Sequence, residues 1–216
     1  KIPDYSMPAT KNAAGFYAAP GMDLIDLFIG SEGVLGIITE VEVALVKQQG
    51  KLSIVQFLSN DEQAMHLTVA LRSNPLLKLD FLEFYSGNAL ALLRKKQTEE
   101  FVQVGVPQIP ESAGAALFFE LSFDPRLGQV DLSALLDTLN SVGADANDSW
   151  VAYEARELER LKAFRHLLPE TVNGIIAERK KTHPGLHKLG TDLSVPDAHL
   201  LDIWQLYQYE CSASGL

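Results

Sequence analysis

The chain has a single cysteine, Cys211, among its 216 residues, so no disulfide can form within it. Because disulfides mark oxidising compartments, their absence favours a reducing one, and we expect the cytoplasm. We expect Cys211 to be a small core residue, because it lies in an amphipathic segment. Long apolar runs are also missing: none reaches the roughly 18 residues that a membrane-spanning helix needs.

Basic residues are scarce. Lys and Arg total 18 against 28 Asp and Glu, which gives a net charge of −10. Binding to nucleic acid requires clustered Lys and Arg side chains, and so does adsorption to an anionic membrane surface. The charge balance therefore predicts neither a nucleic-acid partner nor strong attraction to such a surface.

Common catalytic and metal-binding patterns are absent as well. The five histidines show no HExxH spacing, and a single cysteine excludes a thiolate zinc site. No Gly-x-Ser-x-Gly sequence occurs, and the run Gly-Ser-Glu-Gly at residues 30–33 has the wrong spacing for a serine hydrolase. We therefore expect no metal site and no catalytic triad within these residues.

The most informative stretch is residues 27–40, which read LFIGSEGVLGIITE. Its glycines at positions 30, 33 and 36 let the backbone adopt positive φ or lie close to a ligand. The residues that follow alternate apolar and polar, which predicts a strand over residues 36–46. Two interpretations are open: a cradle of bare amides for a flat or anionic ligand, or a tight turn without a ligand.

A polar break at residues 48–50 predicts a domain boundary, and strand and helix patterns alternate beyond it. The predicted strands cover residues 51–59, 77–85, 115–123, 149–153 and 186–195. The predicted helices cover residues 61–72, 87–96, 131–142, 154–168, 171–181 and 197–209. Their order predicts an α+β fold: a ferredoxin-like βαββαβ domain with an antiparallel sheet and extra helices.

Local signals support the ends of several helices. Asn60 or Asp61 is the expected N-cap of the first helix and Ser86 of the second, while Gly143 is expected to terminate the helix before it. The last helix carries an apolar stripe that we expect to be buried. The stripe consists of Leu200, Leu201, Trp204 and Tyr207.

Upstream of the glycine run lie Lys11-Asn12-Ala13-Ala14-Gly15-Phe16 and Asp23-Leu24. With residues 27–40 they resemble the C-terminal edge of the FAD-binding domain in flavoproteins of the vanillyl-alcohol-oxidase type. The family pattern is Lys-x-Asn-x-x-Gly-Tyr, a spacer, Asp-Leu, then Leu-Phe-Ile-Gly-Ser-Glu-Gly-Thr-Leu-Gly-Ile-Ile-Thr-Glu. Here Asn12 is one place nearer the lysine, Phe16 replaces tyrosine and Val34 replaces threonine. The most similar branch is that of FAD-linked 2-hydroxy-acid dehydrogenases, of the D-lactate dehydrogenase and glycolate oxidase FAD-subunit kind.

The resemblance implies a fragment of a longer enzyme. Residues 1–47 would be the remnant of the FAD-binding domain, and residues 48–216 a substrate-binding cap domain truncated at its C-terminus. The pyrophosphate loop would precede the chain, and the catalytic base would follow Leu216. The implied flavin contacts are Asn12, Gly30, Ser31, Glu32, Gly33, Gly36, Ile38 and Thr39.

Two residues are candidates for binding a substrate carboxylate. In the resembling family, an arginine in the helix ahead of an Asp-x-x-Val-Pro segment contacts the substrate acid, and Arg165 takes that place here. Some relatives have a lysine two residues before that aspartate; here Gly190 occupies the position and Lys188 lies four residues before Asp192. The alternatives are a salt-bridging surface arginine and a solvated edge-strand lysine.

The resemblance implies an FAD-dependent 2-hydroxy-acid dehydrogenase or oxidase, acting on D-lactate or glycolate, with the fragment itself inactive and without bound FAD. The electron acceptor and the specific hydroxy acid are not implied, and a homo-oligomer is left open. The expected compartment is the cytoplasm, with the parent able to lie at the periphery of the inner membrane. The alternative is a regulatory or dimerisation module without catalysis, which would not need the glycine run.

Overall fold

The computed structural model describes residues 10, 16–96, 105–124, 126, 132–188, 190–191 and 193–215. Residues outside these ranges, Asn12 and Asp192 among them, are not described. The chain divides into two compact units. One unit is Gln48–Lys188, and the other combines Lys1–Lys47 with Leu189–Leu216.

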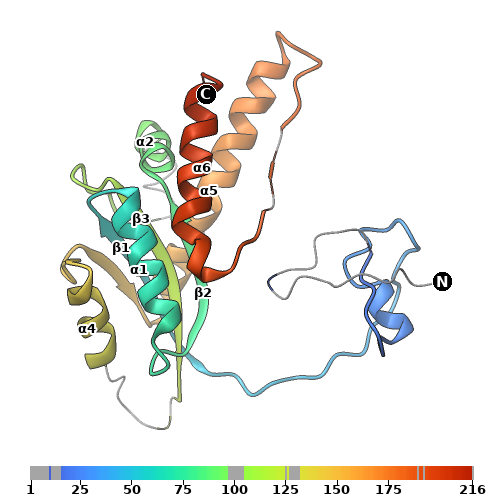
Figure 1. The fold of residues 1–216 in the computed structure, drawn as a ribbon, viewed down its shortest axis with the longest axis horizontal. Coiled ribbons are helices and arrows are strands. Elements are labelled where there is room, and N and C mark those ends of the chain that lie inside the picture. Colours follow the sequence, from blue (N-terminus) through green and yellow to red (C-terminus); the bar gives the residue numbers. More distant parts are fainter. Residues whose placement is uncertain are drawn as a thin grey trace. The chain divides into compact units, whose positions relative to one another are not determined.

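The unit Gln48–Lys188 is built on a four-stranded sheet of β1 (Gly50–Leu58), β2 (Leu79–Tyr85), β3 (Ala115–Phe123) and β4 (Ser149–Ala152). The strand order is β2-β3-β1-β4, and every neighbouring pair is antiparallel. Figure 1 labels β1, β2 and β3 of this sheet. A split βαβ arrangement produces this order: β1 and β2, joined by α1, are not neighbours, and neither are β3 and β4, joined by α4, whereas β2 and β3 lie side by side. The predicted α+β class, a ferredoxin-like antiparallel sheet with extra helices, is confirmed.

In the described part of this unit, four helices accompany the sheet: α1 (Asp61–Ser73), α2 (Gly87–Lys95), α4 (Ser133–Ser141) and α5 (Ala155–Lys180). Both predicted N-caps are present. The Asn60 side chain accepts a hydrogen bond from the Gln63 amide at 2.9 Å, and Ser86 accepts one from the Ala89 amide at 3.2 Å. Helix α1 packs on α4 and β3, whereas α2 and α5 pack on each other and on the sheet.

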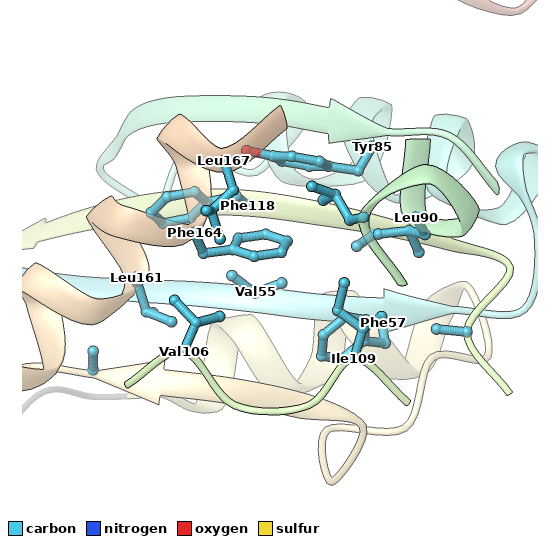
Figure 2. Packing of buried hydrophobic residues seen from close by; sticks show 14 residues of the cluster. Val55, Phe57, Tyr85, Leu90, Val106, Ile109, Phe118, Leu161, Phe164 and Leu167 are labelled. Atoms are coloured by element: carbon cyan, nitrogen blue, oxygen red, sulfur yellow. The ribbon is translucent and has the colours of Figure 1, made fainter. Parts of the chain in front are cut away.

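Strand β3 explains why the sheet needs cover on both faces. Its first five residues and Leu121 are all buried, and successive side chains point to opposite faces. On the α2 and α5 face lies a cluster of apolar side chains (Figure 2). Phe164 of α5 is central to it, with its ring 5.1 Å from that of Tyr85 and 5.3 Å from that of Trp150. This cluster fixes α5 over the sheet.

Helix α5 is one helix of 26 residues that continues through Pro169, so the predicted break into helices 154–168 and 171–181 is wrong. Proline removes one amide donor but has a φ compatible with a helix. The preceding turn is anchored, because Leu161, Phe164 and Leu167 are buried against the sheet. Packing therefore outweighs the local cost of the proline.

Two predicted strands, 36–46 and 186–195, are not found among the described residues. The described residues of 186–195 and all of 36–46 form no ladder with another strand, and nearly all are exposed. Alternating residues favour a strand only where a neighbour supplies hydrogen bonds and an apolar face. A short 3-10 helix, η1 (Leu24–Leu27), precedes the segment 36–46 in the chain.

The last predicted helix is present as a 3-10 turn, η3 (Asp197–His199), followed by α6 (Leu200–Ala213). Its expected buried stripe is wrong: no α6 residue is buried, and Leu200, Leu201 and Trp204 are only partly covered. Cys211 is exposed, which corrects its expected place in a core. None of the helices in the described ranges has the length and apolar character required to cross a membrane.

Candidate functional site

Arg165 of α5 lies against β2. Its Nε donates a hydrogen bond to Glu83 Oε2 at 3.0 Å, and its Cζ lies 4.3 Å from the centre of the Phe81 ring. The guanidinium thus has a carboxylate along one edge and an aromatic ring beneath its plane, an arrangement that favours arginine on both counts. The contact joins α5 to β2 through two residues that are 82 positions apart in the chain.

Glu83 has a second partner in Tyr85. The Tyr85 hydroxyl donates to the same Oε2 atom at 3.2 Å, while its ring is 1% exposed and packs on Phe164. Burial, and then the negative charge of Glu83, raise the pKa of Tyr85 far above its usual 10.0. Tyr85 therefore remains a protonated donor that fixes the Glu83 carboxylate.

The pleat of β2 brings these groups together. Phe81, Glu83 and Tyr85 are two residues apart and therefore share one face of the sheet. Their partners on β3 are Glu120, Phe118 and Ala116. Phe118 belongs to the cluster beneath α5, so these three residues of β2 face α5 and can meet Arg165.

The free edge of the guanidinium defines what the arrangement can bind. Among the described residues, the Nη groups of Arg165 have no hydrogen-bond partner, and the side chain is 46% exposed. Two parallel N–H groups that face solvent match the two oxygens of a carboxylate. The same geometry also suits the alternative of a surface ion pair, because Glu83 is itself 38% exposed.

Lys188 lies near the far part of α5. Its Nζ is 3.4 Å from Oδ1 of Asn173, a long contact, and both side chains are exposed. Asn173 follows Arg165 by eight residues, which is about 12 Å of helix rise. The structure thus associates both predicted substrate-binding residues with α5, without direct contact between them.

Pro169 interrupts the helical hydrogen bonds between these two residues. Because proline has no amide hydrogen, the carbonyl of Arg165 lacks the donor that position 169 would supply. One helical hydrogen bond is therefore missing at the residue that carries the guanidinium.

The glycine run has the open backbone that a ligand cradle requires. Gly30 and Gly33 have φ values of 76° and 80°, and Glu32 between them has a φ of 50°. A Cβ placed on either glycine would meet nothing within 4 Å, so no packing contact within the fold requires glycine at these two positions. Ser31 is buried, and its carbonyl accepts from the Val34 amide at 3.0 Å, which closes the turn. The segment is therefore an open turn, and both interpretations of it stand: a cradle for a flat or anionic ligand, and a turn without a ligand.

The remaining predicted flavin contacts continue from this turn. Gly36, Ile38 and Thr39 are exposed and have no regular secondary structure, whereas Asn12 lies outside the described residues. The structure therefore provides a backbone turn with free surface, followed by an extended chain. In the described ranges, no group of three or more His, Cys, Asp and Glu side chains could hold a metal ion.

Glu83, Tyr85 and Phe81 were not predicted as site residues. The alternation along β2 indicates which of its residues share a face, but it does not reveal that α5 crosses that face. The signal that could have drawn attention to them is a carboxylate between two aromatic residues at two-residue spacing.

Comparison with known proteins gives one informative similarity. No family model matches the chain. It is 30% identical over 190 residues to D-2-hydroxyglutarate dehydrogenase, mitochondrial, from Danio rerio, a match that covers 86% of this chain and 32% of that protein. The chain thus spans about a third of the relative's length. The similarity supports a relation at the level of the FAD-linked oxidases and dehydrogenases but does not distinguish among their branches.

Proposed function

We propose that this chain is part of an FAD-dependent 2-hydroxy-acid dehydrogenase or oxidase, in which Arg165 binds the substrate carboxylate. The observation that carries the proposal is the guanidinium itself: its Nε is bonded to Glu83, its plane lies over Phe81, and its Nη edge is open. The similarity to a 2-hydroxy-acid dehydrogenase supports the same chemistry.

In this proposal the chain orients the substrate. Two parallel hydrogen bonds from Arg165 to the carboxylate fix its plane and so restrict where the neighbouring α-carbon can lie. Such positioning is a major source of rate enhancement, because the reacting atoms no longer have to find one another. FAD, when bound, supplies the acceptor for the hydride that leaves the α-carbon. The electron acceptor that reoxidises it is not identified by these residues.

The glycine run would contact the flavin nucleotide. Gly30 and Gly33 would bring the backbone close to it, because neither carries a Cβ and their positive φ values turn the chain without strain. Ser31, Glu32, Gly36, Ile38, Thr39 and Asn12 remain proposed neighbours of the cofactor. In the same proposal, residues 1–47 belong to the flavin domain and residues 48–216 to the substrate-binding cap.

Two substrate classes are consistent with the site. The monocarboxylates D-lactate and glycolate need only Arg165. The relative's name contains a dicarboxylate, 2-hydroxyglutarate, and Lys188 adds a second cation near α5. Replacing Lys188 by alanine distinguishes the two substrate classes. If Lys188 binds the second carboxylate of D-2-hydroxyglutarate, we expect the KM for this acid to rise about tenfold, which corresponds to about 1.4 kcal/mol of binding free energy. An unchanged KM for that acid, with good turnover of D-lactate, would identify a monocarboxylate enzyme.

The test of the proposed function is substitution of Arg165 in the flavin-loaded protein that contains this chain. We expect Arg165→Lys to lower kcat/KM about 100-fold, because a lysine keeps the charge but loses the two parallel donors. Lys162→Gln is the matched control, since Lys162 is an exposed cation on the same helix, paired with Glu159 at 3.6 Å. Equal effects of the two substitutions would contradict a role for Arg165 in substrate binding.

The 216-residue chain alone is expected to be inactive and without bound FAD. Mixed with FAD, D-lactate and a dye acceptor, it should reduce no dye above background, and turnover would refute this expectation. The alternative of a regulatory or dimerisation module predicts a parent protein that contains no flavin. The single cysteine is in keeping with a reducing compartment such as the cytoplasm, whereas the relative is named as mitochondrial, so fractionation of the parent decides the location.

A further inference from the structure

Glu83 pairs with Arg165 through one hydrogen bond and not through two. The strongest arginine–carboxylate pair is bidentate, with two oxygens facing two parallel N–H groups. Here a single oxygen, Oε2, takes the Nε hydrogen, and among the described residues the Nη groups stay unbonded. Glu83 therefore occupies one edge of the guanidinium and leaves its Nη edge without a bond to a described residue, on a side chain that is 46% exposed.

The Glu83 carboxylate is itself held by a residue of the same strand, Tyr85. The hydroxyl of Tyr85 donates to the same Oε2, and the Tyr85 ring is held by Phe164 in the cluster beneath α5. Ordinary surface ion pairs contribute little, because ordering two flexible side chains offsets the attraction. A carboxylate already ordered by a buried tyrosine lowers that entropic cost.

Phe81 provides the third restraint. Its ring lies 4.3 Å from the Arg165 Cζ and packs edge-on against Phe118 at 5.3 Å, so the ring is itself supported by the sheet. A ring beneath the guanidinium fixes its tilt, and the Nε bond fixes its rotation within the plane. Together these contacts determine the direction in which the Nη edge faces.

We propose that Glu83 and Tyr85 are positioning residues, which with Phe81 hold the Arg165 guanidinium so that its Nη edge is preorganised for the substrate carboxylate. This inference rests on the proposed function, because it assigns these residues a task in the same site. It adds two residues of β2 that neither the glycine run nor the helix sequence points to. Preorganisation of this kind lowers the ordering cost paid on binding.

The first experiment compares kinetics in the flavin-loaded protein that contains this chain. Glu83→Gln keeps the shape of the side chain but loses its charge, and we expect kcat/KM for the 2-hydroxy acid to fall about tenfold. Tyr85→Phe should lower it about threefold, because Glu83 keeps its bond to Arg165. Glu159→Gln is the matched control, since it removes a carboxylate from another exposed pair on α5 and should change nothing.

The second experiment uses a double-mutant cycle to separate positioning of Arg165 from a structural role of Glu83 that does not involve Arg165. In an Arg165→Lys background, Glu83→Gln should have no further effect on kcat/KM, because lysine has no planar pair of N–H donors for Glu83 to orient. Chemical rescue gives an independent readout: guanidinium ion added to Arg165→Ala should restore part of the activity, and the restored part should be lost in Arg165→Ala/Glu83→Gln. A role of Glu83 that is independent of Arg165 predicts additive losses in the cycle and equal rescue in both backgrounds.

Each outcome decides a different claim. If the wild-type flavoprotein oxidises no 2-hydroxy acid, the proposed function fails and the positioning role fails with it. If the wild-type protein is active but Glu83→Gln matches Glu159→Gln, only the positioning role is overturned. If Glu83→Gln lowers kcat/KM, and does so only while Arg165 is present, the inference holds.

Discussion

Two neighbouring stretches of this chain have similar apolar patterns but very different environments. In β1, Ile54 is 3% exposed and Val55 0%, whereas Ile37, Leu45 and Val46 in the preceding segment are 91%, 89% and 92% exposed. Strand β1 has β3 on one side and β4 on the other, and the segment 36–46 has no such partner in the described chain. An apolar pattern therefore becomes a strand only where neighbours complete it. In our proposal the flavin domain supplies them.

The comparison can be tested most strongly by removing one apolar side chain from each region. Phe164→Ala should lower the free energy of unfolding by about 4 kcal/mol, because its ring is fully buried between Tyr85 and Trp150. Ile37→Ala should change it by less than about 0.5 kcal/mol, because that side chain is exposed. Urea denaturation followed by circular dichroism measures both. Similar effects for the two variants would show that segment 36–46 is packed in solution.

Glycine has different tasks in the two regions, and alanine substitutions sharpen that difference. A Cβ on Gly114 would lie 2.0 Å from the carbonyl oxygen of Ser59, so Gly114→Ala should destabilise the sheet unit by about 3 kcal/mol. Gly33→Ala meets no atom within 4 Å but requires a positive φ, so it should cost about 1 kcal/mol, and only locally. Urea midpoints compare them. A larger effect at Gly33 would contradict this account.

Helix α5 is the opposite case to the segment 36–46, because packing there maintains a structure that the local sequence disfavours. Pro169→Ala restores an amide donor for the Arg165 carbonyl and should stabilise the chain by about 2 kcal/mol. Glu170→Ala, at the next and equally exposed position, is the control and should have little effect. Thermal unfolding measures both. A loss of stability in Pro169→Ala would mean that the core requires the proline geometry.

The smallest expected effect is at Tyr85 and depends on pH. Its pKa is raised in the folded chain, so above pH 10.0, its usual value, the unfolded chain loses this proton while the folded chain keeps it. Stability that is fully present below that pH is then lost as pH rises, by up to about 1.4 kcal/mol per pH unit. Tyr85→Phe should cost about 1 kcal/mol at neutral pH and reduce this alkaline slope. An unchanged slope between pH 10 and 12 would contradict the buried, protonated tyrosine.

The sequence predicted the sheet unit well because its signals are local. Strand β3 was expected at residues 115–123 and lies at Ala115–Phe123, since a continuous apolar run of that length is typical of a buried strand. Ser86 was recognised as an N-cap, and Asn60 was one of two candidates with Asp61, because the cap acts within three residues.

The features that were not predicted depend on distant contacts. The continuity of α5 through Pro169 is set by the burial of Phe164 against the sheet, which no local pattern reveals. The contact between Arg165 and Glu83 requires the topology that places α5 over β2. Arg165 itself was proposed from a family resemblance, but the residues that hold it could only be seen once the fold was known.

The most direct test of the central claim is anaerobic reduction of the flavin. The protein that contains this chain would be purified and mixed, without oxygen, with D-lactate, glycolate or D-2-hydroxyglutarate, while its visible absorption is recorded. Our account predicts a yellow protein whose flavin band bleaches with at least one of these acids, and bleaches far more slowly in Arg165→Lys. A colourless protein, or a flavin band that none of the three acids changes, would contradict it.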